Sequence, residues 1–174
     1  MEDIRLVLPH EGYRQQVLEY RQEFLEHGDT MAGCGGLDSA AGFEEWLAQT
    51  IDNRSEATVR PGLVPATLFL AMSADRHRLV GMIDIRHRLN GYLLQYAGNI
   101  GYSIRPSVRR RGYGARMLGL ALEECRAMGL TRVLITCDRD NTASARTMLH
   151  NGAVLENEVA QDGRMIQRYW ITLS

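Results

Sequence analysis

The sequence predicts an α/β protein in which about seven short strands and about four helices follow one another in the order β-α-α-β-β-β-α-β-α-β-β. Apolar runs of strand length alternate with segments whose apolar residues recur at the 3.6-residue spacing of a helix. Glycine, proline, asparagine and aspartate mark the boundaries between these segments. With 174 residues, of which 45% are hydrophobic, the chain is expected to form one domain over residues 1–174 with a full core.

The first half of the chain is expected to contain three strands and two helices. Asp38 and Ser39 are suited to cap the second helix, because short polar side chains accept hydrogen bonds from the first turn. Ser73-Ala74-Asp75-Arg76 is typical of a hairpin loop. The expected elements are a strand at 4–8, helices at 17–28 and 39–51, and strands at 67–71 and 79–85.

The second half is expected to alternate strands and helices and to end in a hairpin. Pro106 stops one strand, and Gly129 is placed to end the helix that follows. Asn141 or Thr142 is expected to cap the last helix, and Asp162-Gly163 is a strong hairpin turn. The expected elements are a loop at 89–97, strands at 99–105, 133–137, 153–159 and 165–173, and helices at 112–129 and 142–150.

The composition excludes several function classes. The formal net charge of −1 gives no global indication of a nucleic-acid or anionic-membrane partner. All 20 basic residues are arginine, so a P-loop lysine and a lysine Schiff base are both excluded. The three cysteines, Cys34, Cys125 and Cys137, lack metal-binding spacing and indicate reduced thiols. With neither a signal-peptide pattern nor a span of about 20 apolar residues, the expected location is the cytoplasm.

The most informative stretch is Arg109-Arg110-Arg111-Gly112-Tyr113-Gly114, which has the spacing Arg-x-x-Gly-x-Gly. It follows an expected strand and opens directly into an expected helix. Backbone N–H groups at such a turn point outward, the helix dipole favours negative charge, and glycine allows the backbone to approach a ligand closely. The stretch therefore predicts an anion-binding site. A dinucleotide site would need this turn early in the chain, followed by an acidic residue about 20 positions later.

This turn, in this context, resembles the pyrophosphate-binding signature of the GNAT superfamily of N-acetyltransferases. The resemblance is supported by the strand Ile100 to Ile104 before it, and by an Asn-x-x-Ser pattern at Asn141 and Ser144. It implies the acyl-CoA N-acyltransferase fold, a twisted mixed sheet flanked by helices, whose fourth and fifth strands splay around acetyl-CoA. It requires no metal. The residues that it implies for acetyl-CoA are Ser103, Ile104, Arg109, Arg110, Arg111, Gly112, Tyr113, Gly114, Asn141 and Ser144.

The chain departs from the family where catalytic residues are common. Met148 stands where many members carry a tyrosine that protonates the leaving thiolate. Asn99 lies where some members have a glutamate or histidine base. Asp84, His87 and Tyr102 are the candidate replacements, because an acidic group, an imidazole and a phenol can all move protons. For Asp84 and His87 a solvent-facing strand position, and for Tyr102 a packed aromatic ring, are alternative interpretations.

The resemblance implies an acetyl-CoA-dependent N-acetyltransferase that acts on a primary amine of a small molecule, amino acid or peptide by direct attack in a ternary complex. A non-catalytic acyl-CoA-binding protein of the same fold is the alternative. Nucleic acid is not an expected partner, because the arginines cluster in one turn. Pairing of the C-terminal strands across a two-fold axis would give a homodimer. The acceptor is expected to have some apolar or aromatic character, on the evidence of Trp46, Tyr92, Tyr96 and Tyr102.

Overall fold

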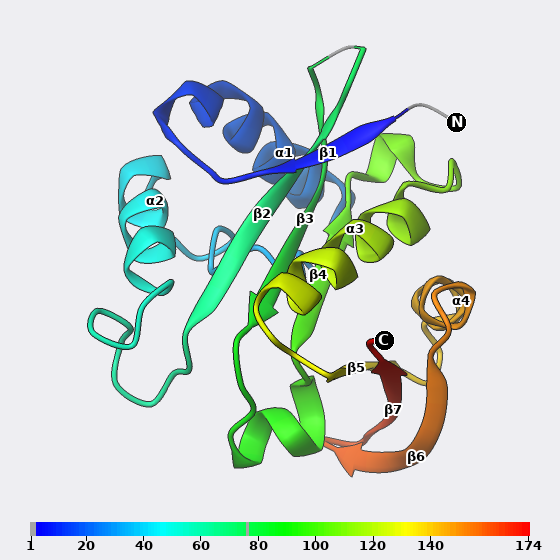
Figure 1. The fold of residues 1–174 in the computed structure, drawn as a ribbon. Coiled ribbons are helices and arrows are strands. Elements are labelled where there is room, and N and C mark those ends of the chain that lie inside the picture. The colour runs from blue at the N-terminus through cyan, green and yellow to red at the C-terminus, as the bar shows by residue number, and fades with distance from the viewer. Residues whose placement is uncertain (1–2, 76) are drawn as a thin grey trace.

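The computed structural model describes residues 3–75 and 77–174, and its centre is a mixed sheet of seven strands (Figure 1). The strands lie in the order β1-β2-β3-β4-β5-β7-β6, and every neighbouring pair is antiparallel except β4 and β5. The strands are β1 (Ile4–Val7), β2 (Ala66–Ser73), β3 (Leu79–Arg86), β4 (Ile100–Ile104), β5 (Arg132–Asp138), β6 (Val154–Gln161) and β7 (Arg164–Thr172). The predicted α/β class with a mixed sheet is confirmed.

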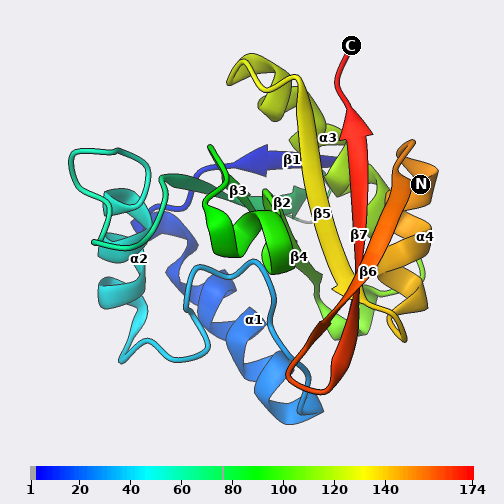
Figure 2. The same ribbon diagram turned by 90° about the horizontal axis from the view of Figure 1, so that it is seen from below.

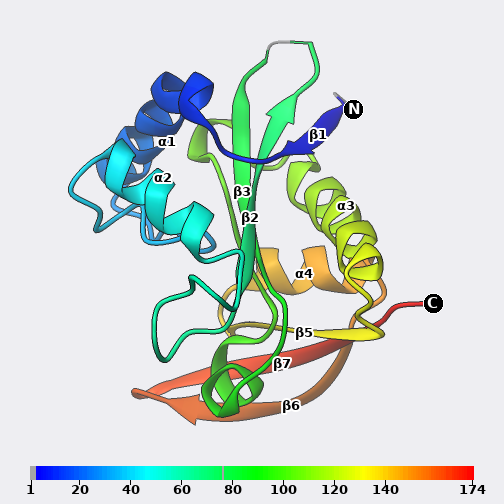
Figure 3. The same ribbon diagram turned by 60° about the vertical axis from the view of Figure 1, so that its left-hand side comes forward.

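Helices cover both faces of this sheet. α1 (Arg14–His27) and α2 (Phe43–Asp52) lie on one face, and α3 (Tyr113–Ala127) and α4 (Thr142–His150) lie on the other (Figure 3). The short helical turns are η1 (Glu11–Tyr13), η2 (Leu93–Ala97) and η3 (Pro106–Val108). No helix in the described part of the chain is long and apolar enough to cross a bilayer.

The alternation of side chains along β2 divides the core in two. Leu68 and Leu70 pack with residues of α1 and α2, whereas Phe69 and Ala71 pack with residues of α3. Strands that are covered on both faces read as continuous apolar runs, which is why the sequence of β2 shows no polar alternation.

The sheet divides where β4 meets β5. The two parallel strands pair at one position only, Ile100 with Ile135, and then diverge. Asn99, which is 3% exposed, replaces the missing ladder bonds with its side-chain amide. Its Nδ2 donates to Arg86 O at 3.2 Å, and its Oδ1 accepts the N–H of Leu134 at 2.9 Å. Because its own backbone N–H turns to Leu134 O at 2.7 Å, one residue connects both sides of the split.

The second helix begins later than predicted. α2 starts at Phe43 with Gly42 as its N-cap, so the expectation that Asp38 and Ser39 cap it is wrong. Both residues lie in a turn before the helix. The Asp38 carboxylate accepts a weak hydrogen bond from the Cys34 thiol at 3.6 Å instead, because the glycine-rich segment folds back on itself.

Other boundaries differ by a few residues. The first strand ends at Val7, not at residue 8, and the segment expected as a loop at 89–97 contains η2, whose Leu93 N–H donates to Asn90 Oδ1 at 2.9 Å. In the predicted hairpin loop at 73–76, Arg76 lies outside the described residues. The hairpin at Asp162-Gly163 is confirmed: the φ angles are 50° and 77°, as a tight antiparallel turn requires. β6 lies at the edge of the sheet. The homodimer expected from pairing of the C-terminal strands stays a prediction.

Asn99→Ala is expected to destabilise the fold strongly. The change leaves the Leu134 N–H and the Arg86 carbonyl without partners at a buried position, and each such group costs roughly 1–3 kcal/mol. Urea unfolding should show this loss, whereas Gln95→Ala on an exposed turn should change the free energy of unfolding by less than about 0.5 kcal/mol. Equal stability of the two variants would contradict the role given to Asn99.

Candidate functional site

An open backbone edge lies between β4 and β5. Arg105 donates its N–H to Val80 O at 2.8 Å, so alternate residues of β4 turn their backbone groups toward β3. The backbone N–H and C=O groups of Tyr102 and Ile104 therefore point toward β5, which has already diverged from β4. Figure 2 shows β5, β7 and β6 running together as one group, with α4 beside them and α2 at the opposite end of the molecule.

The loop before α3 forms a cradle for an anion. Arg110 and Gly112 both have left-handed backbone angles, with φ of 62° and 82°. Alternation of left- and right-handed residues turns successive N–H groups to one side, and the start of α3 adds its dipole. Arg110 and Arg111 are exposed, and their guanidinium groups form no ion pair with a described residue. A left-handed arginine costs free energy, which is typical of a functional loop.

Arg109 plays a different part from its two neighbours. Its Nη1 lies 2.5 Å from Asp29 Oδ2, its Nε donates to Ile104 O at 3.1 Å, and its guanidinium stacks over Phe24 at 5.5 Å. The side chain thus ties the loop to the end of α1. Of the three predicted arginines, Arg110 and Arg111 are free for a ligand and Arg109 is held by the protein.

Gly114 and Tyr113 fix the position of the helix start. Tyr113 is buried in the core under α3. A Cβ on Gly114 would lie 3.4 Å from Thr147 Oγ1 and 3.7 Å from Ile104 Cγ1, so α3 begins in close contact with α4 and β4. The predicted cofactor residues around this turn therefore lie side by side at the mouth of the split.

On the α4 side of β4, three polar side chains meet. The Tyr102 hydroxyl lies 2.7 Å from Ser144 Oγ, and the Cys137 thiol of β5 lies near the same pair. Burial raises the pKa of Tyr102 to about 12 and the pKa of Cys137 to about 11, so both keep their protons at neutral pH. Asn141, predicted to contact the cofactor, caps α4 by accepting the Ser144 N–H at 3.1 Å.

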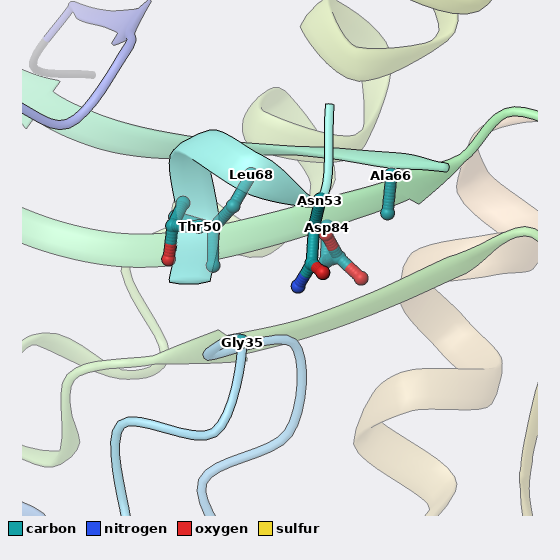
Figure 4. Close-up of a pocket in the computed structure, with 6 residues that line it drawn as sticks. All are labelled: Gly35, Thr50, Asn53, Ala66, Leu68 and Asp84. Carbon is teal, nitrogen blue, oxygen red and sulfur yellow. The ribbon is translucent and has the colours of Figure 1, made fainter. Parts of the chain in front are cut away.

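On the opposite side of the sheet, Asp84 forms the floor of a cavity between β3 and α2 (Figure 4). Its side chain is 14% exposed, and its nearest charged partner is Arg86, with Nε 3.6 Å from Oδ2. Burial raises the pKa of the Asp84 carboxyl, and the charges of Arg86 and His87 offset only part of that effect. Asp84 is therefore a stronger base than an exposed aspartate.

Two polar atoms beside Asp84 are buried without a hydrogen-bond partner in residues 3–75 and 77–174. They are Thr50 Oγ1 and Asn53 Oδ1, and both side chains line the same small cavity of about 40 Å³. Figure 4 shows the Asn53 and Asp84 side chains ending close to each other. Since buried polar groups are normally paired, this oxygen-rich corner is suited to receive a hydrogen-bond donor from a ligand.

The small cavity shares part of its wall with a larger one of about 510 Å³. Two arginines, Arg60 and Arg86, line the larger cavity together with Leu63, Tyr92 and Leu93. Arg60 is exposed, and its guanidinium group makes no ion pair or hydrogen bond to a described residue. The cavity therefore combines one buried carboxylate, two guanidinium groups and an apolar wall.

A protein-family model described as an acetyltransferase (GNAT) domain matches residues 14–154 of this chain. The matched region contains the glycine-rich loop before α3, the split between β4 and β5, and the Asp84 cavity. The chain belongs to the GNAT family of acetyltransferases. No curated protein matches it.

Solved GNAT structures share the whole fold. The ribosomal-protein-S5-alanine acetyltransferase from Vibrio fischeri matches with a TM-score of 0.76 at 15% identity, over 99% of this chain and 94% of that one. The microcin C7 self-immunity acetyltransferase MccE, solved with acetyl-CoA and AMP, matches at 0.70 and 18%, over 99% and 93%. The ribosomal L7/L12 acetyltransferase RimL, solved with coenzyme A, matches at 0.70 and 16%, over 98% and 94%. At these low sequence identities, the structural similarity establishes a shared fold.

In this GNAT acetyltransferase the predicted catalytic residues do not gather in one place. Asp84 faces the α1–α2 side of the sheet and Tyr102 faces α4. His87 lies against Thr67, with its Nε2 2.7 Å from Thr67 Oγ1, and it does not line either cavity. Ser103, predicted to bind the cofactor, bonds its Oγ to the Tyr20 hydroxyl at 2.9 Å. Met148 is fully buried in the core.

Five polar residues that line the two cavities were not predicted as site residues from the sequence: Thr50, Asn53, Arg60, Arg86 and Asn90. Arg86 had a usable signal, because it lies two positions after Asp84 on β3 and so shares its face. Arg60 lies in a connecting loop without periodicity, and only the fold shows that this loop forms a wall of the cavity. No metal-like cluster of His, Cys, Asp or Glu occurs among the residues described.

Asp84→Asn is expected to stabilise the folded protein at neutral pH. An aspartate whose pKa is raised on folding contributes stability below its unfolded pKa of about 4, and that contribution is lost as the pH rises through the folded-state pKa. The variant does not titrate, so its free energy of unfolding should exceed that of the wild type at pH 7 and converge with it near pH 4. Parallel urea titrations across this range measure the difference, and a wild type more stable at pH 7 would contradict the assignment.

Proposed function

We propose that this GNAT acetyltransferase uses acetyl-CoA as co-substrate and acetylates a primary amine of a small molecule, an amino acid or a peptide by direct attack in a ternary complex. The observation that carries the proposal is that two groups able to transfer protons, Asp84 and Tyr102, lie on opposite faces of the sheet. The Asp84 cavity lies on one face, and the Tyr102–Ser144 pair lies on the other. In acyl transfer, the nucleophile and the leaving group likewise lie on different sides of the carbonyl carbon.

The loop residues fit the pyrophosphate of acetyl-CoA. The backbone from Arg110 to Gly114 offers N–H groups, and the guanidinium groups of Arg110 and Arg111 offer charge. The open edge of β4 continues from this loop, so the backbone groups of Tyr102 and the N–H of Ile104 can pair with the pantetheine arm, whereas the Ile104 carbonyl already accepts from Arg109. An N–H from this edge would stabilise the negative charge that develops on the thioester oxygen.

Asp84 is the proposed base. An amine reaches the cavity as an ammonium ion and attacks only after it loses a proton. A carboxylate with a raised pKa, beside two oxygens that lack donors, can both hold the ammonium and take that proton. As the new C–N bond forms, the C–S bond breaks and coenzyme A leaves as a thiolate.

Tyr102 is the proposed acid toward that thiolate. Its hydroxyl is protonated at neutral pH and bonds to Ser144, which can pass the proton along the pair. This arrangement would replace the tyrosine that Met148 displaces from α4. It uses a side chain from the edge strand instead of one from the helix.

Gly114→Val is expected to weaken acetyl-CoA binding at least tenfold in isothermal titration calorimetry. The contacts to Thr147 and Ile104 leave room for a Cβ but not for two further methyl groups, which would push the start of α3 away from α4 and β4 and so displace the loop. Gly114→Ala is the matched control and should bind within about threefold of wild type. A folded valine variant with wild-type affinity would contradict the placement of the pyrophosphate.

Asp84→Asn is expected to lower kcat by a factor of about 10² to 10⁴ with little change in the dissociation constant for acetyl-CoA. Release of free thiol during turnover with a panel of primary amines measures kcat. Thr67→Val, near the predicted His87 but outside the cavities, is the control and should keep kcat within about threefold. If the wild type binds acetyl-CoA but acetylates no amine, the alternative of a non-catalytic acyl-CoA-binding protein replaces the proposal.

A further inference from the structure

We infer that the acceptor is a free α-amino acid, whose ammonium group binds at Asp84 and whose carboxylate binds at Arg86. This inference rests on the proposed function and narrows its acceptor to one chemical class. It starts from the spacing of the two charges: Arg86 Nε lies 3.6 Å from Asp84 Oδ2. An α-amino acid carries its ammonium and carboxylate on one carbon atom, so its two charges match neighbouring charges of opposite sign.

The oxygen atoms around Asp84 are suited to accept hydrogen bonds from an ammonium group. An ammonium group has three N–H donors and no acceptor. Around Asp84 the unpartnered Thr50 Oγ1 and Asn53 Oδ1 supply two further oxygens, and Thr50 is only 3% exposed. A buried ammonium would satisfy all three groups at once, which a neutral apolar ligand cannot do.

The guanidinium group of Arg86 is positioned to bind an anion beside β4. Its Nη1 donates to the carbonyls of Ala97 and Gly98, at 3.3 Å and 3.2 Å, which holds the guanidinium in place. Its Nη2 makes no hydrogen bond to a described residue and lies beside Gly101, 3.3 Å from where a Cβ would stand. Asp84 pairs with the same Gly101 across the ladder, so both charges lie next to the strand on which the thioester would be held.

The rest of the cavity favours the same class. Arg60 and Arg86 outnumber the one carboxylate of Asp84, so the charged lining has a net charge of +1 and disfavours polyamines. Leu63 and Tyr92 leave an apolar wall for a side chain in a cavity of about 510 Å³. A protein N-terminus has an amide where the amino acid has its carboxylate, and it would leave Arg86 without its partner.

The decisive experiment compares each of the common L-amino acids with its own carboxamide as acceptor for the wild-type enzyme. The two members of a pair share the side chain and the primary amine and differ at the carboxyl group; since the amide also has the less basic amine, a faster reaction of the acid cannot come from easier loss of the ammonium proton. For the pairs that react, we expect kcat/KM to be about tenfold or more higher for the acid, because a hydrogen bond to a charged group is lost in the amide. Equal or faster acetylation of the amides overturns the inference, and so does exclusive acetylation of peptides or polyamines.

Variants test which side chain makes the distinction. Arg86→Gln should reduce the preference for the acid to less than about threefold, and Arg86→Lys should keep part of it because the charge remains. Arg88→Gln is the matched control: Arg88 is exposed, pairs with Glu56 and does not line the cavity, so the full preference should remain. If Arg86→Gln does not fold, the comparison of amino acids with their carboxamides in the wild-type enzyme still tests the inference.

The two proposals fail in different ways. Binding of acetyl-CoA without transfer to any amine, acid or amide would contradict the proposed function. Transfer to amines without a preference for the acid would leave the N-acetyltransferase function in place and remove only the amino acid class.

Discussion

The parting of β4 from β5 after a single residue pair is the constraint on which the rest of the structure depends. A split in a sheet leaves backbone groups without partners inside the core, and these groups must be satisfied. Asn99 does this with one amide, which accepts from β5 and donates to the end of β3. Asn99, at the position where the sequence resemblance places a base in some family members, therefore joins the two sides of the split.

This structural role of Asn99 is one reason that we propose other residues for the proton transfers. With Asn99 bonded on both sides and Met148 packed in the core, neither position can reach a substrate. The ionisable groups near the split include Asp84, one strand away, and Tyr102 on β4 itself. Both have a raised pKa for the same reason, which is burial, but the consequence differs: the carboxyl becomes a better base and the phenol stays protonated.

The sequence predicted the parts of this protein that depend on local chemistry. The strand and helix order, the glycine turn before α3, the cap at Asn141 and the hairpin at Asp162-Gly163 all follow from short-range preferences, and the structure has them. The predicted start of α2 was wrong because tertiary contacts fix the segment before the helix. Gly33 in this segment packs so closely against β4 that a Cβ would lie 2.2 Å from the carbonyl oxygen of Gly101. The cavity was not predictable for the same reason, since α2, β3 and the loop containing Arg60 meet only in the folded chain.

The arrangement around Gly101 connects cofactor and acceptor recognition. On β4 the absence of a side chain lets the 31–36 loop, the Arg86 guanidinium and the backbone of Asp84 approach the same residue. Tyr102, the next residue along, points to the other face and to Ser144. The strand that would hold the thioester thus lies between the charged Asp84 cavity and the Tyr102–Ser144 hydroxyl pair. In the proposed mechanism Asp84 would take a proton from the amine and Tyr102 would give one to the thiolate, and the strand between them keeps the two groups from neutralising each other.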